Sequence, residues 1–577
     1  MKYLKKFETE NDRTSYENSE SYIEPYVSYV DGGDVHYNKV PETRVIAIFN
    51  VTNTSDQVMI LSDYEYIDTL AAKVEVDDGT VYENLEHDYG LYHTFETSGE
   101  HTVYYTLINP TETADWMFGG CEQMKTVVIP TNVTKLGVGT FDWCKGLTSV
   151  APKGSGASVE IPSNIASISD CAFEDCSSLT SVTIPDSVTS IGADTFRYCT
   201  GLTSINIPDS VTSIGGGAFQ YCYFLTGVTI GSGVTSIGDN AFYSCTGLTS
   251  ITIPDNVVNV GSGVCYSCRS LSSVTIGNSV TSIGNQAFAN CYSLITAIIG
   301  NSVTSIDYEA FMLCTGLTSV TIGSGVTSIG DYSFQNCHSL TSVTIPNSTT
   351  IIGVQAFQYC SGMTTAVINS GSIGRNAFYA CSGLTSVTIG SGVTSIGEEA
   401  FAYCSGLTSV TIPSGVTSIG EEAFYYCSGM TTAVINGGSI GEEAFYGCIS
   451  LTSVTIGDNV TSIGYRSFLS NGRLVSVTIG SGVTSIGGEA FKYCNTLTDL
   501  TIGDSVTTID IDAFSSCRSL NSITSLATTA PTIKSSTFSG ISQNGTLYVP
   551  SGSTGYDTWM STGDYYLGKY NWTKVEQ

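Results

Sequence analysis

The sequence has 577 residues, which is long enough for several compact domains, but its composition does not fit helical bundles. Charged residues make up only 13%, glycine occurs 61 times and proline only 13 times. The net charge of −31 repels phosphate backbones, so nucleic acid is excluded as an expected partner. No segment approaches the roughly 18 consecutive apolar residues of a membrane span, so membrane insertion is not expected.

The N-terminal segment does not have the pattern of a secretory signal. It begins MKYLKKFETENDRTS, in which the lysines are followed by polar and acidic residues where a signal would have an apolar stretch. We therefore expect the chain to be made and folded in a cytoplasm. Residues 1–45 are predicted to be a polar leader or docking segment.

Residues 46–111 are predicted to form a small β-sandwich-like domain. Alternating apolar segments such as RVIAIFNVTN, QVMILS, AAKVEVD and HTVYYTL have the pattern of strands, and turn clusters such as DDGT separate them. The region up to residue 105 is disproportionately acidic, which fits an oligomerising or docking role.

The cysteines recur at a fixed interval, which is the main organising signal of the sequence. Nine of them follow one another at steps of 23, from Cys176 to Cys360. The series continues at steps of 21 or 23 to Cys517, with Asn471 in one cysteine position. Cys121 and Cys144 begin the series, ahead of an insertion that contains APKGSGAS. A period between 20 and 50 residues indicates a solenoid, here with about 18 coils.

One repeat, FEDCSSLTSVTIPDSVTSIGADT, predicts the structure of a coil. Its segment LTSVTI has the L-x-x-L-x-L form of a leucine-rich repeat, with Val182 and Ile184 directed inward and Thr183 outward. A second extended piece, VTSIG, closes the coil. Stacked copies bury one continuous core, because a single unit cannot bury its own apolar face.

The predicted fold is therefore mainly β. A leucine-rich-repeat solenoid spans residues 112–541, and residues 542–577 form a C-terminal cap. Strands about 4.8 Å apart would give a rod or arc on the order of 85 Å long. Two 21-residue units, GMTTAVINSGSIG and GMTTAVINGGSIG, lack two turn residues, and we expect a local change of curvature there.

The units LTSVTIPDSVTSIGADTFRYC and LTSVTIGSGVTSIGEEAFAYC resemble the BspA-type leucine-rich repeats of bacterial surface proteins and some protists. The resemblance covers about residues 112–541. It implies an adhesin or other surface-binding protein, and it carries over no catalytic residue.

The two ends of the chain carry a second resemblance. The leader MKYLKKFETENDRTSYENSESYIEPYVSYVDGGDVHYNKV and the segment SGEHTVYYTLINPT resemble parts of gut bacteriophage virion proteins and of proteins from their Bacteroides-type hosts. The tail GTLYVPSGSTGYDTW resembles the closing strand and cap that follow such repeats. The resemblance to virion proteins implies a virion surface or tail-appendage protein, made in the host cytoplasm, that recognises a bacterial surface glycan or protein. Its N-terminal region would contact other virion proteins.

Two other functions remain open. The chain is alternatively a bacterial cell-surface adhesin of the BspA type, or a structural spacer whose ends do the binding. Self-association into a homo-oligomer is compatible with each of these functions.

The sequence gives no sign of an enzyme, a cofactor site or a metal site. His338 follows Cys337, but that cysteine occupies the repeated buried slot, where cysteine behaves as a small hydrophobe. Cys265 and Cys268 form a single C-x-x-C without a second pair, and Cys265 stands where other units have Phe. Disulfides are not expected in a reducing compartment.

Tyrosines gather just before the cysteine slot and form the first candidate binding edge. Aromatic rings at an edge can stack on sugar rings or anchor a protein contact, or they can simply pack on the neighbouring coil. This edge comprises Tyr198, Tyr221, Tyr243, Tyr266, Tyr359, Tyr379, Tyr403, Tyr425, Tyr426, Tyr446 and Tyr493.

The outward threonines of the LTSVTI strand form the second candidate surface. A flat face rich in hydroxyl groups can bind glycans or protein, but threonine is also a good soluble strand residue with hydroxyl contacts between neighbours. The strand face comprises Thr183, Thr229, Thr252, Thr275, Thr321, Thr344, Thr388, Thr411, Thr455, Thr478 and Thr501.

An acidic row follows the glycine of VTSIG in three consecutive units. Carboxylates stacked at coil spacing repel one another unless cations lie between them, and calcium can bridge them. No Asp/Asn/Gly calcium loop accompanies the row, so a solvated surface is the favoured interpretation. Its members are Glu398, Glu399, Glu421, Glu422, Glu442 and Glu443.

Overall fold

The computed structural model describes residues 44–62, 71–83, 85, 90–150 and 158–577, and the backbone of three strands nearer the N-terminus. The chain divides into two compact units, Met1–Val257 and Val258–Gln577. Regular structure in the described part is almost entirely β, with one 3-10 helix, η2 (Leu567–Tyr570). This confirms the predicted mainly β fold. No helix among the described residues is both long and apolar enough to cross a membrane.

The N-terminal unit contains a small antiparallel sheet in the order β10-β4-β9-β6-β7. Its strands are β4 (Arg44–Val51), β6 (Lys73–Val76), β7 (Val81–Glu83), β9 (Gly99–Thr106) and β10 (Met124–Val128). A separate antiparallel pair consists of β5 (Val58–Leu61) and β8 (Leu91–His93). The predicted small β-domain is therefore present, and the expected DDGT turn connects β6 to β7. Strand β10 belongs to the first repeat, so its place in this sheet was not predicted.

Three further strands lie in the predicted leader. They are β1 (Lys5–Lys6), β2 (Tyr26–Asp31) and β3 (Asp34–Lys39), and they pair in the order β1-β3-β2. The rest of the leader lies outside the described residues, so the docking role remains a prediction.

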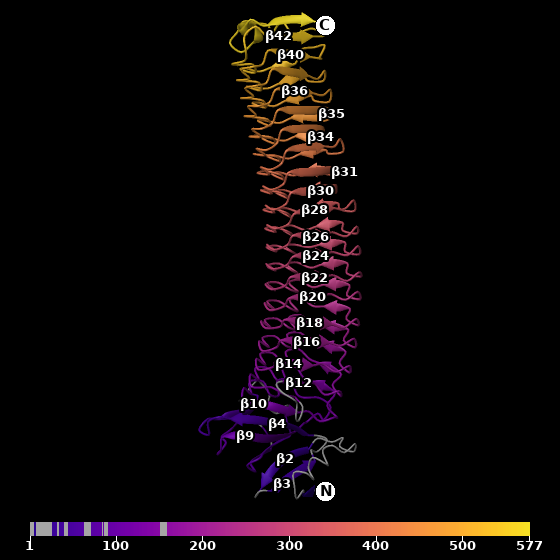
Figure 1. Cartoon of the computed structure of the whole chain (residues 1–577), viewed down its shortest axis with the longest axis vertical. Coiled ribbons are helices and arrows are strands. Elements are labelled where there is room, and N and C mark those ends of the chain that lie inside the picture. The colour runs from indigo at the N-terminus through magenta and orange to yellow at the C-terminus, as the bar shows by residue number, and fades with distance from the viewer. Residues whose placement is uncertain are drawn as a thin grey trace. The chain divides into compact units, whose positions relative to one another are not determined.

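The repeats of the N-terminal unit each supply two short strands to a coil (Figure 1). The first set is β12 (Ser158–Glu160), β14 (Ser181–Thr183), β16 (Ser204–Ile207), β18 (Gly227–Ile230) and β20 (Ser250–Thr252). The second set, from VTSIG, is β11 (Lys135–Leu136), β13 (Ser167–Ile168), β15 (Ser190–Ile191), β17 (Ser213–Ile214) and β19 (Ser236–Ile237). Pairing is parallel, and each residue faces its counterpart in the next coil, as Val182 faces Ile205.

The C-terminal unit repeats this arrangement. Its first set is β22 (Ser273–Thr275), β24 (Thr296–Ile298), β26 (Ser319–Thr321), β28 (Ser342–Ile345), β32 (Ser409–Ile412), β36 (Ser476–Ile479), β38 (Asp499–Ile502) and β40 (Ser522–Ser525). The second set is β21 (Asn259–Val260), β23 (Ser282–Ile283), β25 (Ser305–Ile306), β27 (Ser328–Ile329), β29 (Ile351–Ile352), β33 (Ser418–Ile419), β37 (Ser485–Ile486), β39 (Thr508–Ile509) and β41 (Thr532–Ile533).

The two 21-residue units have a different strand pattern. Without the two turn residues, both strands of the coil merge into β30 (Thr365–Ile373) and β34 (Thr432–Ile440). The coil that follows each of them is also continuous, as β31 (Ser386–Ile396) and β35 (Ser453–Ile463), and the register shifts where the lengths differ. Gly371 and Gly438 have φ of +99° and +89° at these shifts, a backbone that glycine adopts readily. The expected change of curvature remains a prediction.

The core of each coil is a set of ladders of identical residues. In the C-terminal unit, phenylalanine rings from Phe311 to Phe514 stack with centroids 4.9 to 5.3 Å apart. Most slot cysteines donate from Sγ to the carbonyl oxygen of an earlier phenylalanine, as Cys427 does to Phe401 at 3.2 Å, and Cys291 donates to the Cys265 carbonyl instead. The ladder therefore satisfies the thiol while it buries the rings.

The turn before each cysteine has two residues in the left-handed region. These residues lie five and one positions before the cysteine, as Glu399 and Tyr403 do, with φ of +52° and +60°. Their backbone amides donate to the next coil, Tyr403 N to Tyr425 O at 2.8 Å. The glycine of VTSIG packs on the preceding coil, since a Cβ on Gly420 would lie 2.5 Å from the Gly397 carbonyl carbon.

The C-terminal end closes the solenoid with larger side chains. Strands β42 (Thr546–Val549) and β43 (Thr573–Glu576) extend the parallel sheet. Trp559 ends the phenylalanine ladder with its ring centroid 5.4 Å from that of Phe538, and its indole N–H donates to the Pro531 carbonyl at 3.0 Å. These bulky residues cover the last apolar coil, which a stack of repeats leaves open.

Candidate functional site

The predicted tyrosine edge consists of two columns in the same turn of the repeat. The outer column lies one residue before the cysteine slot and comprises Tyr198, Tyr221, Tyr359, Tyr403, Tyr426 and Tyr493. The inner column lies two residues before it and comprises Tyr243, Tyr266, Tyr379, Tyr425 and Tyr446. The predicted edge was a single group of tyrosines, and the structure divides it into these two columns.

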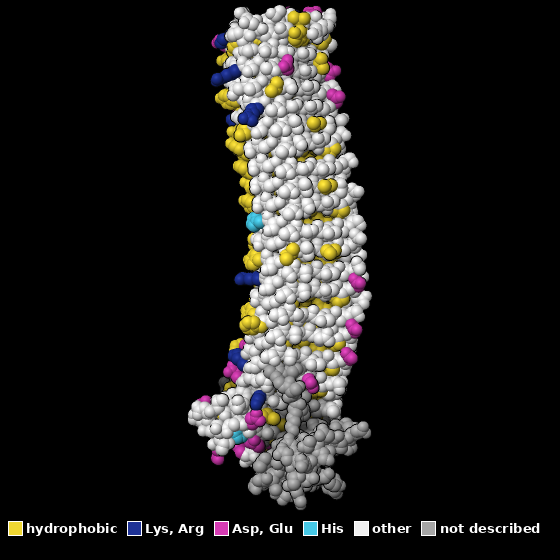
Figure 2. Space-filling model, viewed as in Figure 1, with side chains coloured by type: hydrophobic (Ala, Val, Ile, Leu, Met, Phe, Trp, Pro, Cys, Tyr) yellow, Lys and Arg dark blue, Asp and Glu magenta, His cyan; other side chains and the backbone are white. Residues whose placement is uncertain are grey.

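The outer column projects from the left-handed backbone position described above. All six of its tyrosines have φ between +52° and +63°. In the C-terminal unit, Tyr359, Tyr403, Tyr426 and Tyr493 are 40 to 46% exposed, whereas the inner-column tyrosines are half-buried. Figure 2 shows hydrophobic side chains in a row along the left edge of this unit.

The tyrosines of the C-terminal unit contact one another from coil to coil. The ring centroid of Tyr403 lies 5.3 Å from that of Tyr379, 5.7 Å from Tyr425 and 5.8 Å from Tyr426. Tyr425 stacks on Tyr446 at 5.1 Å. We call Tyr379, Tyr403, Tyr425, Tyr426 and Tyr446 the tyrosine cluster. The rings pack on their neighbours, as one interpretation of the edge expects, and the binding role of the edge remains a prediction.

The N-terminal unit has a smaller group of the same kind. Tyr198 stacks on Tyr221 with centroids 4.6 Å apart, and Tyr221 meets Tyr243 edge-on at 5.5 Å. The guanidinium of Arg197 lies 5.0 Å from the Tyr198 ring centroid. One of these rings is therefore already covered by a cation from the chain itself.

The acidic row lies beside the tyrosine cluster and affects its electrostatics. Burial, the neighbouring rings of Tyr426 and Tyr403, and the charge of Glu422 together raise the pKa of Tyr425 to about 12. Burial, and then repulsion from Glu399 and Glu443, raise the pKa of Glu422 above its ordinary value. The cluster is thus an aromatic surface under a negative potential.

The six glutamates of the acidic row do not have equivalent partners. Glu398 pairs with Arg375 at 3.3 Å, and Glu443 pairs with Arg466 at 3.5 Å. Glu399 accepts a hydrogen bond from the Asn376 amide at 3.0 Å. In the part of the chain that the structure describes, no group of three or more His, Cys, Asp or Glu side chains has an arrangement that could hold a metal ion.

The strand-face threonines alternate with buried residues as the repeat predicts. All are exposed except Thr501, which is half-buried. Within the described residues, none of their hydroxyls makes a hydrogen bond to the chain, so the face is available to solvent or a partner.

Other threonines make the hydroxyl contacts between coils. One column lies just before the first strand, where Thr408 Oγ1 donates to the Thr385 carbonyl at 3.1 Å and Thr431 Oγ1 to that of Thr408 at 3.0 Å. A second column lies in VTSIG, where Thr417 Oγ1 donates to the Thr394 carbonyl at 3.0 Å. The expected hydroxyl contacts are therefore made by these other threonines. The strand-face hydroxyls project from the face of the sheet, whereas the backbone carbonyls lie in its plane and point to the neighbouring strands.

The cysteine positions have the inert environment that the sequence predicts. Cys337, Cys265 and Cys268 are buried, and burial raises the pKa of the Cys337 thiol well above its ordinary value. His338 is exposed, and its Nδ1 lies 2.9 Å from the Tyr359 carbonyl oxygen. A nucleophilic cysteine requires a lowered pKa, so this environment does not support catalysis there.

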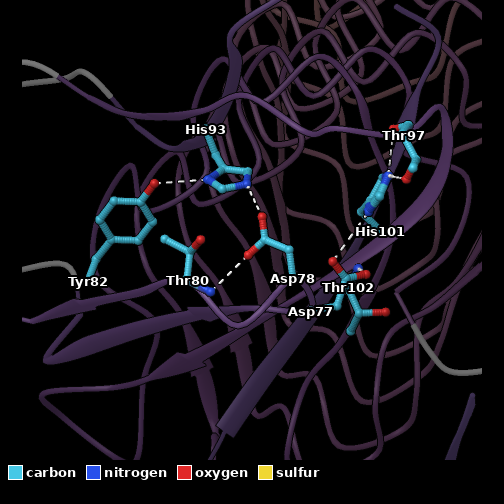
Figure 3. A network of polar contacts seen from close by, with 8 residues as sticks. All are labelled: Asp77, Asp78, Thr80, Tyr82, His93, Thr97, His101 and Thr102. Carbon is cyan, nitrogen blue, oxygen red and sulfur yellow. Dashed lines mark hydrogen bonds and ion pairs between the residues drawn. The ribbon is translucent and has the colours of Figure 1, made fainter. Parts of the chain in front are cut away.

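A polar network in the N-terminal β-domain was not predicted from the sequence (Figure 3). His93 is 7% exposed; its Nε2 lies 2.7 Å from Asp78 Oδ2 and its Nδ1 lies 2.9 Å from the Tyr82 hydroxyl. The Thr80 amide donates to Asp78 at 2.8 Å. The network joins β8 to the turn between β6 and β7.

The arrangement in Figure 3 resembles a catalytic triad only in its connectivity. Burial, followed by the charge of Asp78, raises the pKa of Tyr82, whereas a nucleophilic hydroxyl needs activation. Burial also acts to raise the pKa of Asp78, but hydrogen bonds from Thr80 and His93 outweigh it and leave that pKa below its ordinary value. The network therefore links β8 to the hairpin of β6 and β7, and its tyrosine is not activated as a nucleophile.

The coils and their ladders define a parallel β-solenoid with a repeated exposed surface. The sequence profile described as the BspA type leucine rich repeat region matches residues 153–268, 235–364, 371–498 and 438–559. These segments cover more than half of the chain, and the chain belongs to this family. The match confirms the resemblance to BspA-type repeats and indicates no catalytic family.

The solved structures that are similar to the chain include three leucine-rich repeat proteins from bacteria. A leucine-rich repeat protein from Bacteroides ovatus is 28% identical over 66% of this chain and 87% of its own, with a TM-score of 0.47. A leucine rich cell surface protein from Faecalibacterium prausnitzii is 29% identical over 53% and 89%, with a TM-score of 0.33. A leucine rich repeat protein from T. pallidum is 25% identical over 37% and 83%, with a TM-score of 0.28. No curated protein matches the chain.

Proposed function

We propose that this chain is a non-enzymatic binding protein of the bacterial cell surface and that it holds a macromolecular partner through the tyrosine cluster. The observation that carries the proposal is the coil-to-coil packing of partly exposed tyrosines in the C-terminal unit. Packed tyrosines lose little side-chain freedom on binding and present large amphipathic contacts. The BspA-type repeat supports a surface location, which is the alternative that the sequence left open beside a virion.

Binding of the full chain to intact gut bacteria and to their extracted surface glycans tests the proposal. Saturable binding is expected, and the variant Tyr403→Ala, Tyr425→Ala, Tyr426→Ala is expected to weaken it by at least about tenfold, since hot-spot aromatics contribute roughly 2 kcal/mol each. The matched control replaces strand-face threonines of nearby coils, Thr411→Ala and Thr455→Ala. Loss of binding in the control alone would assign the partner to the strand face.

The surface location is tested separately on cells that produce the chain. Antibody labelling and protease treatment of intact cells should reach it, and exclusive recovery from the cell interior would contradict the proposal. Absence of binding to every surface tested would leave the structural spacer as the better account.

The virion hypothesis is the finer assignment and rests on the resemblance of the N-terminal leader and β-domain to gut bacteriophage proteins. The repeat family gives it no support, and most of the leader lies outside the described residues. Mass spectrometry of purified phage particles tests it directly. Recovery of this chain from particles would move the binding surface from a cell to a virion without changing its residues.

A further inference from the structure

In some coils, the turn that carries the tyrosines also holds a lysine or arginine side chain of the chain itself. In the coil of Cys494, Lys492 occupies the inner-column position, and its Nζ lies 5.7 Å from the Tyr493 ring centroid. The same ammonium lies 2.9 Å from Glu489 and 3.1 Å from Asp512, both at the position five residues before a cysteine. One tyrosine and two carboxylates thus surround one cation.

The N-terminal unit contains a second, independent example. In the coil of Cys199, Arg197 occupies the inner-column position, 5.0 Å from the Tyr198 ring centroid. Its guanidinium lies 3.3 Å from Glu174 and 3.9 Å from Asp194. In both of these coils, a cation at the inner-column position lies close to carboxylates and to the outer-column tyrosine.

The coils of Cys404 and Cys427 retain the carboxylate and the tyrosine but lack the internal cation. The inner-column position holds Ala402 in one coil and Tyr425 in the other, while Glu399 and Glu422 stand where Glu489 stands in the lysine coil. Within the described residues, no lysine or arginine pairs with Glu399 or Glu422. The missing cation also explains why the pKa of Glu422 is raised. Burial and repulsion from the neighbouring glutamates act on this carboxylate, and no paired cation offsets them.

We propose that the tyrosine cluster, with Glu399 and Glu422, binds the lysine or arginine side chains of an extended basic segment of a partner protein. This inference rests on the proposed binding function and names its partner class. A partner's cations would take the position that Lys492 and Arg197 fill in their own coils.

The spacing of the cluster favours a polypeptide over a single small cation. Ring centroids of successive coils lie 5.1 to 5.8 Å apart, and alternate side chains of an extended peptide lie roughly 6.5 to 7 Å apart. Flexible lysine side chains can absorb this difference, so several cations of one segment can engage neighbouring coils. An acidic glycan would be repelled by the same carboxylates, and the described residues offer no metal-binding group.

Binding of a synthetic peptide to the full chain tests the inference. The probe is a fluorescent peptide of alternating lysine and serine, and its control is the same peptide with every lysine acetylated, which removes the charge. At about 50 mM NaCl, saturable binding of the first peptide is expected, and it should weaken as salt screens the charges. The acetylated peptide is expected not to bind.

Charge-neutral variants then locate the site. The double variant Glu399→Gln, Glu422→Gln is expected to weaken peptide binding by about tenfold, since two charge contacts are lost. The matched control, Asp458→Asn and Asp504→Asn, removes the same charge from exposed positions away from the cysteine turn and should change binding by less than about twofold. Equal losses in both variants would overturn the inference, because binding would then follow net charge alone.

A second pair of variants tests the aromatic contribution. The double variant Tyr403→Leu, Tyr425→Leu is expected to weaken binding of the peptide by about fivefold to tenfold. The double variant Tyr403→Phe, Tyr425→Phe is expected to retain binding, since phenylalanine keeps the ring face. Equal binding by the leucine and phenylalanine variants would overturn the role of the rings. Far-ultraviolet circular dichroism of each variant confirms that the solenoid is folded.

The two proposals fail in different ways. A chain that binds cells or glycans but not the lysine peptide would retain the proposed function and overturn the basic-segment inference in favour of a glycan partner. A chain that binds the peptide at the cluster but is absent from the cell surface would retain the inference and overturn the surface location.

Discussion

The N-terminal β-domain and the coils of the solenoid achieve burial in opposite ways. In the coils, each core residue lies against its own counterpart, as Phe378, Phe401 and Phe424 do with ring centroids 5.1 and 5.2 Å apart. In the β-domain, contacts such as those of His93 with Asp78 and Tyr82 join unlike residues that belong to no repeat. A substitution in a ladder disturbs one of many similar layers, whereas a substitution in the β-domain removes a contact that has no copy.

The largest effect is expected from a break in the phenylalanine ladder. Phe401→Ala leaves a cavity between two stacked rings and should lower the free energy of unfolding of the C-terminal unit by about 3 to 5 kcal/mol. Urea denaturation measures the change, and hydrogen exchange should locate it to the neighbouring coils. Phe224→Ala is the control, because that side chain is 66% exposed, and its effect should be near zero. A small effect at Phe401 would mean that the coils collapse to fill the gap.

The second largest loss of stability is expected when the contact of His93 with Asp78 and Tyr82 in the β-domain is removed. His93→Ala leaves the Asp78 carboxylate and the Tyr82 hydroxyl without the imidazole and should cost about 2 to 3 kcal/mol. The contribution of Asp78 to the free energy of unfolding depends on pH, and the direction follows from its pKa. Since the pKa of Asp78 is lowered in the folded chain, its contribution is present above the unfolded value near 3.8 and is lost as pH falls through the folded value.

Thermal unfolding at pH 7 and at pH 3 measures this contribution. The difference between the native chain and Asp78→Asn should shrink at the lower pH. His338→Ala, at an exposed position in the solenoid, serves as the neutral control. An equal difference at both pH values would show that the carboxylate charge does not contribute.

Asn471 is the one exception in the cysteine ladder from Cys176 to Cys517, and its replacement by cysteine should stabilise the C-terminal unit. Asn471 is buried in the cysteine slot, where its amide donates to Phe445 and Phe468, but its Oδ1 has no hydrogen-bond partner. Asn471→Cys removes the unsatisfied oxygen and restores the repeat, and it should stabilise the unit by about 1 to 2 kcal/mol. Calorimetry measures the gain, and Asn471→Ser, which retains a polar group, should give less. A loss of stability would show that the two donated hydrogen bonds outweigh the unsatisfied oxygen.

A further effect, which depends on pH, is expected in the first coils, where a buried carboxyl group lies in the turn before Cys144. Burial, and then repulsion from Glu174 and Asp175, raise the pKa of Asp142 to about 7. A carboxyl group with a raised pKa is penalised when charged, so its cost is absent below the unfolded value near 3.8 and complete above pH 7. Asp142→Asn should therefore raise the melting temperature more at pH 8 than at pH 5. The same rise at both values would mean that the charge is not the cause.

The period of the sequence determined most of the solenoid by itself. Identical residues at a fixed interval must stack when the chain coils, so the buried slots of Cys427 and Phe401 and the outward direction of Thr411 follow from one repeat. The same repeat period predicted the tyrosine edge and the acidic row. Their position beside each other, however, depends on the left-handed backbone of the turn, which no residue type in the sequence marks.

The tertiary structure alone decided the features that do not repeat. Strand β10 pairs with β4 although the repeat assigns it to the first coil, and the Asp78–His93–Tyr82 network joins strands that the sequence separates. The cation position occupied by Lys492 became visible only when distances across coils were known. A repeat shows which residues are equivalent, because equivalence is a property of the sequence. Which unlike residues meet is decided only when the chain is folded, because that depends on the path of the backbone.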